Sequence, residues 1–304
     1  HFTDRRQRQM CIRDRFYRVY SASLSDPWFG GIQPVQFSTS FSHTKQYRYN
    51  YFTGRVDKSA SFEITGASVG LAKRLRIPDD YFTLSQSLAY QYYNLNNYYT
   101  GLFPFGDGSS NNLSYTVALS RNNTFTNPIF PLGGSEFVLS ARFSLPYSLW
   151  NGVDYANLGD LEKFQDDDGN PDPAKIEQEK FKWLEFYKIK FKGSWYTRLF
   201  DKLVLRTHTE FGFLGAFNND RGVIPFDRFF LGGDGMSQYA MDGRETISLR
   251  GYPNQSLSSQ DGSTIYNRFS LELRYPITLK PAASIFGLTF METGQGYNLS
   301  LIHI

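Results

Sequence analysis

The sequence predicts an all-β fold, a transmembrane antiparallel up-and-down β-barrel. Three observations predict it: apolar and polar residues alternate along most of the strand-like runs, short and long connections alternate, and aromatic residues gather near the ends of runs. With 21 tyrosines and 28 phenylalanines in 304 residues, the chain is rich in aromatics, yet its mean hydropathy is −0.43. Alternating strands combine these two properties, whereas long apolar helices do not.

Alternation with a period of two is clearest toward the end of the chain. In the run 264–276, Phe269 and Leu271 alternate with Ser270 and Glu272, as in a strand with one apolar face. The ten runs are 16–24, 35–44, 60–73, 82–94, 112–121, 135–145, 181–197, 202–216, 264–276 and 283–293. The face that we expect to meet lipid carries Trp183, Ile189, Phe191, Leu203, Leu205, Phe269, Leu271 and Leu273.

Connections of two kinds alternate along the chain. The longer ones are 45–59, 95–111, 146–180 and 217–263, and the shorter ones are 25–34, 74–81, 122–134, 198–201 and 277–282. Barrels of the outer-membrane type have short turns on the periplasmic side and long loops outside. A short helix at 173–182 is expected inside one of the long loops. Aromatic pairs near the ends of runs, such as Trp195 and Tyr196, fit the girdles found at membrane interfaces.

Composition and charge exclude several classes of protein. No stretch reaches the roughly 18 consecutive apolar residues that a membrane-spanning helix needs, but a barrel strand needs only about 10 residues with every second one apolar. The net charge of +3 and the absence of a basic block argue against a nucleic-acid partner. The acidic stretch 165–173 does not match a calcium loop, since alignment puts Phe164 first and Lys175 where Glu is needed. No metal or cofactor is predicted.

Both ends of the chain look foreign. Residues 1–15 have neither the apolar core nor the small-residue cleavage site of a signal peptide. The strings MCIRDR (10–15) and LSLIHI (299–304) resemble translated sequencing-adaptor read-through. We therefore expect a barrel domain at 16–297, with non-native tails at 1–15 and 298–304. The only cysteine, Cys11, lies in the first tail and supports no redox argument.

Catalysis is not predicted from the residues, although a barrel with lipase or protease activity stays an alternative. His43 and His208 are far apart, and neither accompanies a Ser or Cys in a nucleophile motif. The row Lys188, Lys190 and Lys192 on one polar face has two interpretations. It either lines an ion path or hydrates the interior of a barrel.

Five dispersed segments carry a resemblance to a known family. They are SLSDPWFGG (23–31), SRNNTFTNPIFPLGGSEFVLSARF (120–143), PFDRFFLGGDG (225–235) followed by LRGY (249–252), SLEL (270–273) and FMETG (290–294). In this order the chain resembles the barrel of outer-membrane protein assembly factors of the BamA type, most like the versions in Bacteroidota. The resemblance implies that the ten runs are about ten of sixteen strands, so that the barrel would be a partial one. The first three strands, the last three and the periplasmic POTRA domains would then be absent.

The resemblance also implies a functional loop. The motif Leu249, Arg250, Gly251 and Tyr252 would belong to the family's sixth extracellular loop, which folds back into the barrel. There the Arg250 guanidinium would meet the acidic positions of the next two strands, Glu272 and Glu292. The last motif contributes Phe290, Glu292 and Gly294, and Glu292 stands where the family usually has Asp.

The function implied is the folding and insertion of other proteins into the bacterial outer membrane. Its partners would be unfolded outer-membrane protein clients, accessory assembly lipoproteins and outer-membrane lipid. A passive outer-membrane pore or a secretion transporter of a related barrel family is the main alternative. A soluble β-sheet enzyme or lectin is a third hypothesis, which solubility without detergent would favour.

Overall fold

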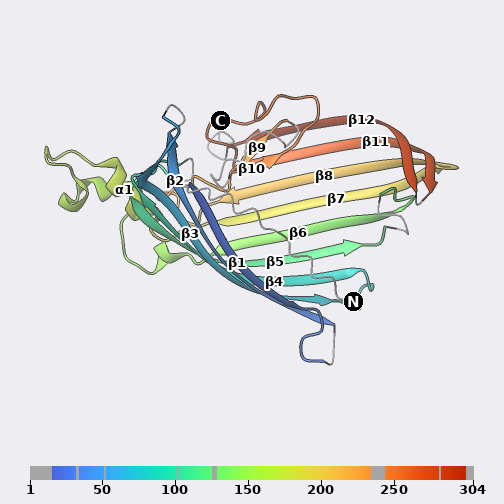
Figure 1. The fold of residues 1–304 in the computed structure, drawn as a ribbon, viewed down its shortest axis with the longest axis horizontal. Helices are drawn as coiled ribbons and strands as arrows, with labels where there is room; N and C mark the ends of the chain where they lie inside the picture. Colours follow the sequence, from blue (N-terminus) through green and yellow to red (C-terminus); the bar gives the residue numbers. More distant parts are fainter. Residues whose placement is uncertain are drawn as a thin grey trace.

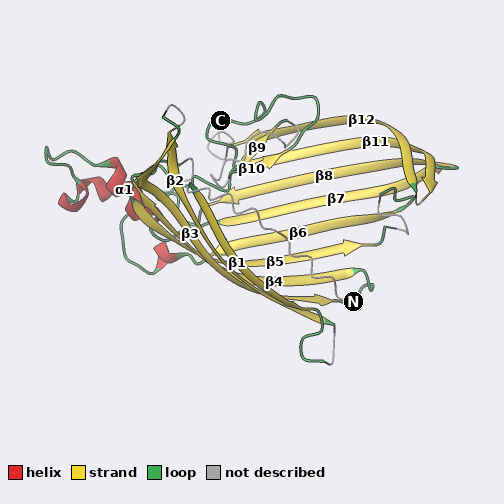
Figure 2. Ribbon diagram, viewed as in Figure 1, coloured by secondary structure: helices red, strands yellow, loops and turns green. Residues whose placement is uncertain are grey.

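Ten long strands form one antiparallel sheet in chain order, curved into a trough (Figures 1 and 2). The computed structural model describes residues 16–31, 34–50, 53–100, 103–124, 129–233, 244–280 and 282–298. Within these ranges β1 pairs only with β2, and β12 only with β11, so β1 and β12 are the edges of the sheet. The strands are β1 (Tyr17–Asp26), β2 (Val35–Asn50), β3 (Arg55–Arg74), β4 (Phe82–Asn96), β5 (Gly108–Asn122), β6 (Gly134–Ser144), β7 (Tyr187–Phe200), β8 (Leu203–Gly215), β11 (Ile265–Lys280) and β12 (Ala283–Tyr297). The predicted all-β, partial-barrel architecture is confirmed. The tail predicted at 1–15, and residues 299–304 of the tail predicted at 298–304, lie outside the described residues.

The longest connections lie at one end of the sheet, as predicted. The connections β6–β7 and β8–β11 are at the left of Figure 1, and the turns β7–β8 and β11–β12 are at the right. The long loop predicted at 45–59 is wrong, because β2 continues to Asn50 and β3 begins at Arg55. The Arg48 guanidinium lies 2.6 Å from the Asp57 carboxylate across this hairpin, so charged side chains pair on the extended strands.

The predicted strand 181–197 begins too early. Residues Pro173–Phe181 form the helix α1, and β7 begins only at Tyr187. The Asp172 carboxylate accepts a hydrogen bond from the Ala174 amide at 2.9 Å, and Pro173 occupies the first turn. These are strong helix-start signals, which confirm the short helix expected here. Trp183 therefore lies in a connection, and its assignment to the outer face of the sheet is wrong.

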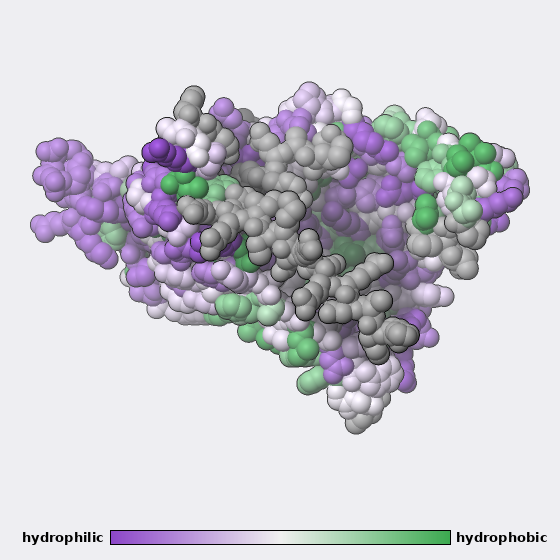
Figure 3. Space-filling model, in the orientation of Figure 1, coloured by the Kyte–Doolittle hydropathy of each residue, from purple (hydrophilic) through white to green (hydrophobic). Residues whose placement is uncertain are grey.

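The two faces of the sheet differ in polarity. Along β11, Phe269, Leu271 and Leu273 point outward and are about 40 % exposed, whereas Ser270 and Glu272 on the inner face are buried. Apolar side chains outside and polar side chains inside are the pattern of a barrel in lipid. Figure 3 shows apolar residues near the turn ends of β11 and β12, and hydrophilic residues on the connection that carries α1. No helix in the described part of the chain is long and apolar enough to cross a membrane.

The connection between β8 and β11 packs against the inner face of the sheet. It contains two short parallel strands, β9 (Phe229–Leu231) and β10 (Glu245–Ile247). The Phe229 ring lies 4.6 Å from the ring of Tyr266 on β11, and both residues are fully buried. This apolar packing explains why so long a connection returns to the sheet instead of extending into solvent.

Candidate functional site

The LRGY segment is fixed to Gly233, which precedes it in the same connection, by backbone hydrogen bonds. The Leu249 amide donates to the Gly233 carbonyl at 2.9 Å, and the Gly233 amide donates to the Tyr252 carbonyl at 3.0 Å. Leu249 is fully buried, and Gly251 has a φ of +86°, a conformation that favours glycine. The turn therefore anchors Leu249 and leaves the side chain of Arg250 directed at the sheet.

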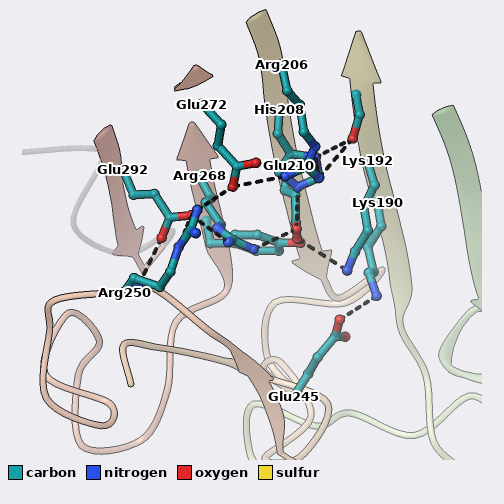
Figure 4. Close-up of polar contacts among 12 residues, drawn as sticks. Lys190, Lys192, Arg206, His208, Glu210, Glu245, Arg250, Arg268, Glu272 and Glu292 are labelled. Atoms are coloured by element: carbon teal, nitrogen blue, oxygen red, sulfur yellow. Dashed lines mark hydrogen bonds and ion pairs between the residues drawn. The ribbon is translucent and has the colours of Figure 1, made fainter. Parts of the chain in front are cut away.

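Arg250 lies between two carboxylates on neighbouring strands (Figure 4). Its Nη2 atom is 2.6 Å from Glu272 Oε1 on β11 and 2.6 Å from Glu292 Oε1 on β12. Its backbone amide also donates to Glu292 Oε2 at 2.9 Å. The contacts expected of Arg250, Glu272 and Glu292 are therefore present. Charge-assisted hydrogen bonds of this geometry are among the strong ones.

Of the other two residues of the last motif, Phe290 lies at this contact. The Arg250 guanidinium carbon is 3.7 Å from the centre of the Phe290 ring, within cation–π distance. Gly294 does not touch Arg250 and acts through the sheet instead. A Cβ atom at Gly294 would lie 2.8 Å from the carbonyl oxygen of Asn267 on β11, so glycine allows close strand pairing there. Tyr252 takes part through its carbonyl, and its side chain is 41 % exposed.

Arg250 joins a larger charged network on the inner face. Arg268 bridges Glu210 at 3.0 Å and Glu292 at 3.1 Å, and Arg206 lies 3.3 Å from Glu272. His208 Nε2 lies 2.8 Å from Glu210. The alternation in 264–276 predicted a polar face for Glu272, but it predicted no pairing of Glu272 with Arg206. Their pairing depends on the register of β8 against β11, in which Glu210 stands opposite Arg268.

The lysine row on β7 is paired with acids. Lys188 lies 2.8 Å from Glu245 and 3.1 Å from Asp227, Lys190 contacts Glu245, and Lys192 lies 3.3 Å from Glu210. Glu245 and Asp227 both belong to the β8–β11 connection. Lys188 and Lys190 therefore bind the returning loop to the sheet, and Lys192 pairs within the sheet with Glu210 on β8. This pairing disfavours the interpretation of the row as an ion path.

A second buried ion pair was missed at the sequence level. Arg221 Nη1 lies 2.6 Å from Glu185 Oε2, and both side chains are less than 5 % exposed. Glu185 also accepts hydrogen bonds from the amide and hydroxyl of Ser148, at 2.8 and 2.7 Å. The pair joins the β8–β11 connection to the β6–β7 connection. Two isolated charges in separate loops carry no spacing signal from which this contact could be predicted.

Fold and site together define a membrane β-barrel of the outer-membrane type with a loop clamped against its inner face. A family model described as the Omp85 superfamily domain matches residues 12–300, and the chain belongs to this superfamily.

A solved structure shows the same fold. BamA from Haemophilus ducreyi lacking POTRA domains 1–3 aligns with a TM-score of 0.62 at 18 % identity, over 95 % of this chain and 51 % of that one. This chain thus spans about half the length of that protein. CdiB from Escherichia coli aligns with a TM-score of 0.46 at 14 % identity, over 91 % of this chain and 42 % of that one. The comparison with curated proteins gave no match.

Proposed function

We propose that this chain is the barrel part of an assembly factor that folds and inserts other β-barrel proteins into the bacterial outer membrane. Membership of the Omp85 superfamily and the barrel fold imply an outer-membrane location. The observation that carries the proposal is Arg250, which ties the β8–β11 connection to both Glu272 and Glu292. Because Arg250, Glu272 and Glu292 pair with one another, these charges hold the loop in place and are not free to bind a solute. This arrangement supports a structural role for the loop.

The proposed activity requires no covalent step. The clients would be unfolded outer-membrane proteins. An unpaired strand edge can template a client strand through its free N–H and C=O groups. Accessory lipoproteins and outer-membrane lipid are the other proposed partners. The clamped loop would keep the inner face rigid while edge strands elsewhere in the complete barrel exchange partners.

A secretion transporter of the same superfamily is the alternative, and depletion of the complete protein in its source bacterium separates the two. Barrel proteins in washed outer membranes would be quantified by mass spectrometry. An assembly factor predicts that many unrelated barrel proteins fall together. Loss of a single secreted substrate, with barrel proteins at normal levels, would contradict the proposal and favour the transporter.

A further inference from the structure

A pocket of about 400 Å³ lies beside α1, at the end of the sheet that carries the long connections. Its walls come from the β6–β7 connection, together with Arg221 of the β8–β11 connection. This volume is within the range of about 300–1,000 Å³ for small-molecule sites. Four aromatic side chains line it: Tyr147, Trp150, Tyr155 and Trp183.

Two of the aromatic rings offer open faces. Trp150 is 67 % exposed and Trp183 is 37 % exposed, although tryptophan is usually buried to a large extent. The Trp183 ring is held in place by Tyr147, with 4.9 Å between the ring centres. Rigid, exposed tryptophans at a pocket give a ligand a flat apolar surface at low cost in conformational entropy.

The same pocket offers hydrogen-bonding groups around the rings. The hydroxyl oxygen of Tyr147 is buried and has no hydrogen-bond partner among the described residues. Burial raises the pKa of this phenol, so it stays a neutral donor. The Asn151 amide donates to Tyr155 Oη at 2.6 Å, which orients both groups. An unpaired buried hydroxyl costs free energy unless a ligand or water completes it.

The charges at the pocket nearly cancel. The charge of Arg221 is neutralised by Glu185 at 2.6 Å, and Glu179 lies 3.8 Å from Lys163, which leaves one net positive charge, on Lys182. A ligand with a high charge of either sign would therefore gain little here. A purely apolar ligand would leave polar groups of the pocket without partners, which costs free energy.

The buried ion pair keeps the pocket preformed. Arg221 donates hydrogen bonds to the carbonyls of Lys180 and Trp183, and its guanidinium lies 4.8 Å from the centre of the Tyr155 ring. It thereby fixes the backbone on both sides of Lys182 and the orientation of two aromatic walls. Preorganisation of this kind lowers the entropic cost of binding a ligand.

We infer that this pocket binds a neutral saccharide. A sugar ring has a C–H face that packs on an aromatic ring and a rim of hydroxyls that donate and accept hydrogen bonds. Open tryptophan faces, the oriented polar groups of Asn151 and Tyr155, and a nearly balanced charge match that combination. The site is independent of the Arg250 contact, so it stands whether or not the assembly function holds.

The test uses the full-length protein in a detergent without sugar headgroups, such as lauryldimethylamine oxide. Neutral oligosaccharides of glucose, mannose, galactose and xylose would be titrated while tryptophan fluorescence and saturation-transfer NMR are recorded. At least one series is expected to bind. Trp150→Ala and Trp183→Phe are each expected to weaken it about tenfold or more, because a few buried aromatic contacts dominate binding energy.

Trp28→Ala is the matched control, since Trp28 is also an exposed tryptophan (53 %) but lies in the β1–β2 connection. It is expected to bind saccharide as the unmodified protein does. Trp150 is on the surface, so its removal should leave the heat-modifiable band of the folded barrel on gels. No binding by any series at millimolar concentration, or equal binding by Trp150→Ala, would overturn the inference. Binding of aromatic peptides to the pocket, with no binding of any saccharide, would also overturn the inference.

Discussion

Arg250 and Glu292 meet at three points although 42 residues separate them in the sequence. The backbone amide of Arg250 lies 2.9 Å from Oε2, while Nε and Nη2 lie 3.0 and 2.6 Å from Oε1. The Glu292 side chain is only 1 % exposed. Glu292 therefore holds both the backbone and the side chain of the motif. Glu272 makes one contact to Arg250 and also lies 3.3 Å from Arg206.

Glu292→Gln is expected to loosen the β8–β11 connection more than Glu272→Gln does. The first change removes a charge that faces Arg250 and Arg268, at 2.6 and 3.1 Å. Because the Arg250 side chain is 37 % exposed, we expect a loss of about 1–3 kcal/mol, between the values for exposed and buried pairs. Protease cleavage within residues 216–264 of the full-length protein measures this release. A larger release in Glu272→Gln would refute the order of the two partners.

Gly294→Ala is expected to destabilise the pairing of β11 with β12. Its Cβ atom would lie 2.8 Å from the backbone oxygen of Asn267, and backbone cannot move aside cheaply. Overpacking of this kind costs about 1–3 kcal/mol. Gly287→Ala on the same strand is the control, since no atom lies within 4 Å of its added Cβ. Hydrogen exchange of β11 amides should rise in the first variant only. Equal exchange in the two variants would show that close packing at Gly294 is unimportant.

Leu139 and Val138 test which face of the sheet meets lipid. They are neighbours on β6 with similar exposure, 45 % and 42 %. Leu139 stands opposite Phe191 on the outer face, and Val138 stands opposite Lys192 on the inner face. Leu139→Lys should cost about 2–4 kcal/mol in the membrane, while Val138→Lys should cost much less. Denaturant unfolding of the full-length protein in lipid vesicles measures both free energies. The reverse order would invert the assignment of the faces.

Much of the fold could be predicted because polar and apolar residues alternate along a strand whose two faces meet different surroundings. The alternation of Ser270 and Glu272 with Leu271 and Leu273 already shows which residues of β11 lie on the inner face and which on the outer face. The N-terminal bound of β7 could not be read in this way. The alternation at 182–186 continues that of the strand, although these residues follow α1 and connect it to β7.

The site was predictable only through the family resemblance. Nothing in the residues near Arg250 states that the loop turns inward, since that depends on the packing of Phe229 against Tyr266. The pairs of Glu245 with Lys188, and of Arg221 with Glu185, join residues from different connections. Such contacts follow from the curvature of the whole sheet. A single sequence carries no local signal for them.

We propose that Arg250 holds the β8–β11 connection inside the barrel and that this arrangement is needed for assembly. The amount of folded barrel protein in outer membranes of cells that depend on the Arg250→Glu variant of the full-length protein is the readout for this proposal. Arg55→Glu is the matched control, because Arg55 is an exposed arginine at the start of β3, at the end of the sheet with the long connections, and the charge change is the same.

With the Arg250→Glu protein present at the normal level, the account predicts several-fold less folded barrel protein and rapid cleavage of the β8–β11 connection. Cells with Arg55→Glu are predicted to match the unmodified protein in both respects. Normal amounts of folded barrel protein and an intact, protease-resistant connection in Arg250→Glu would contradict the account.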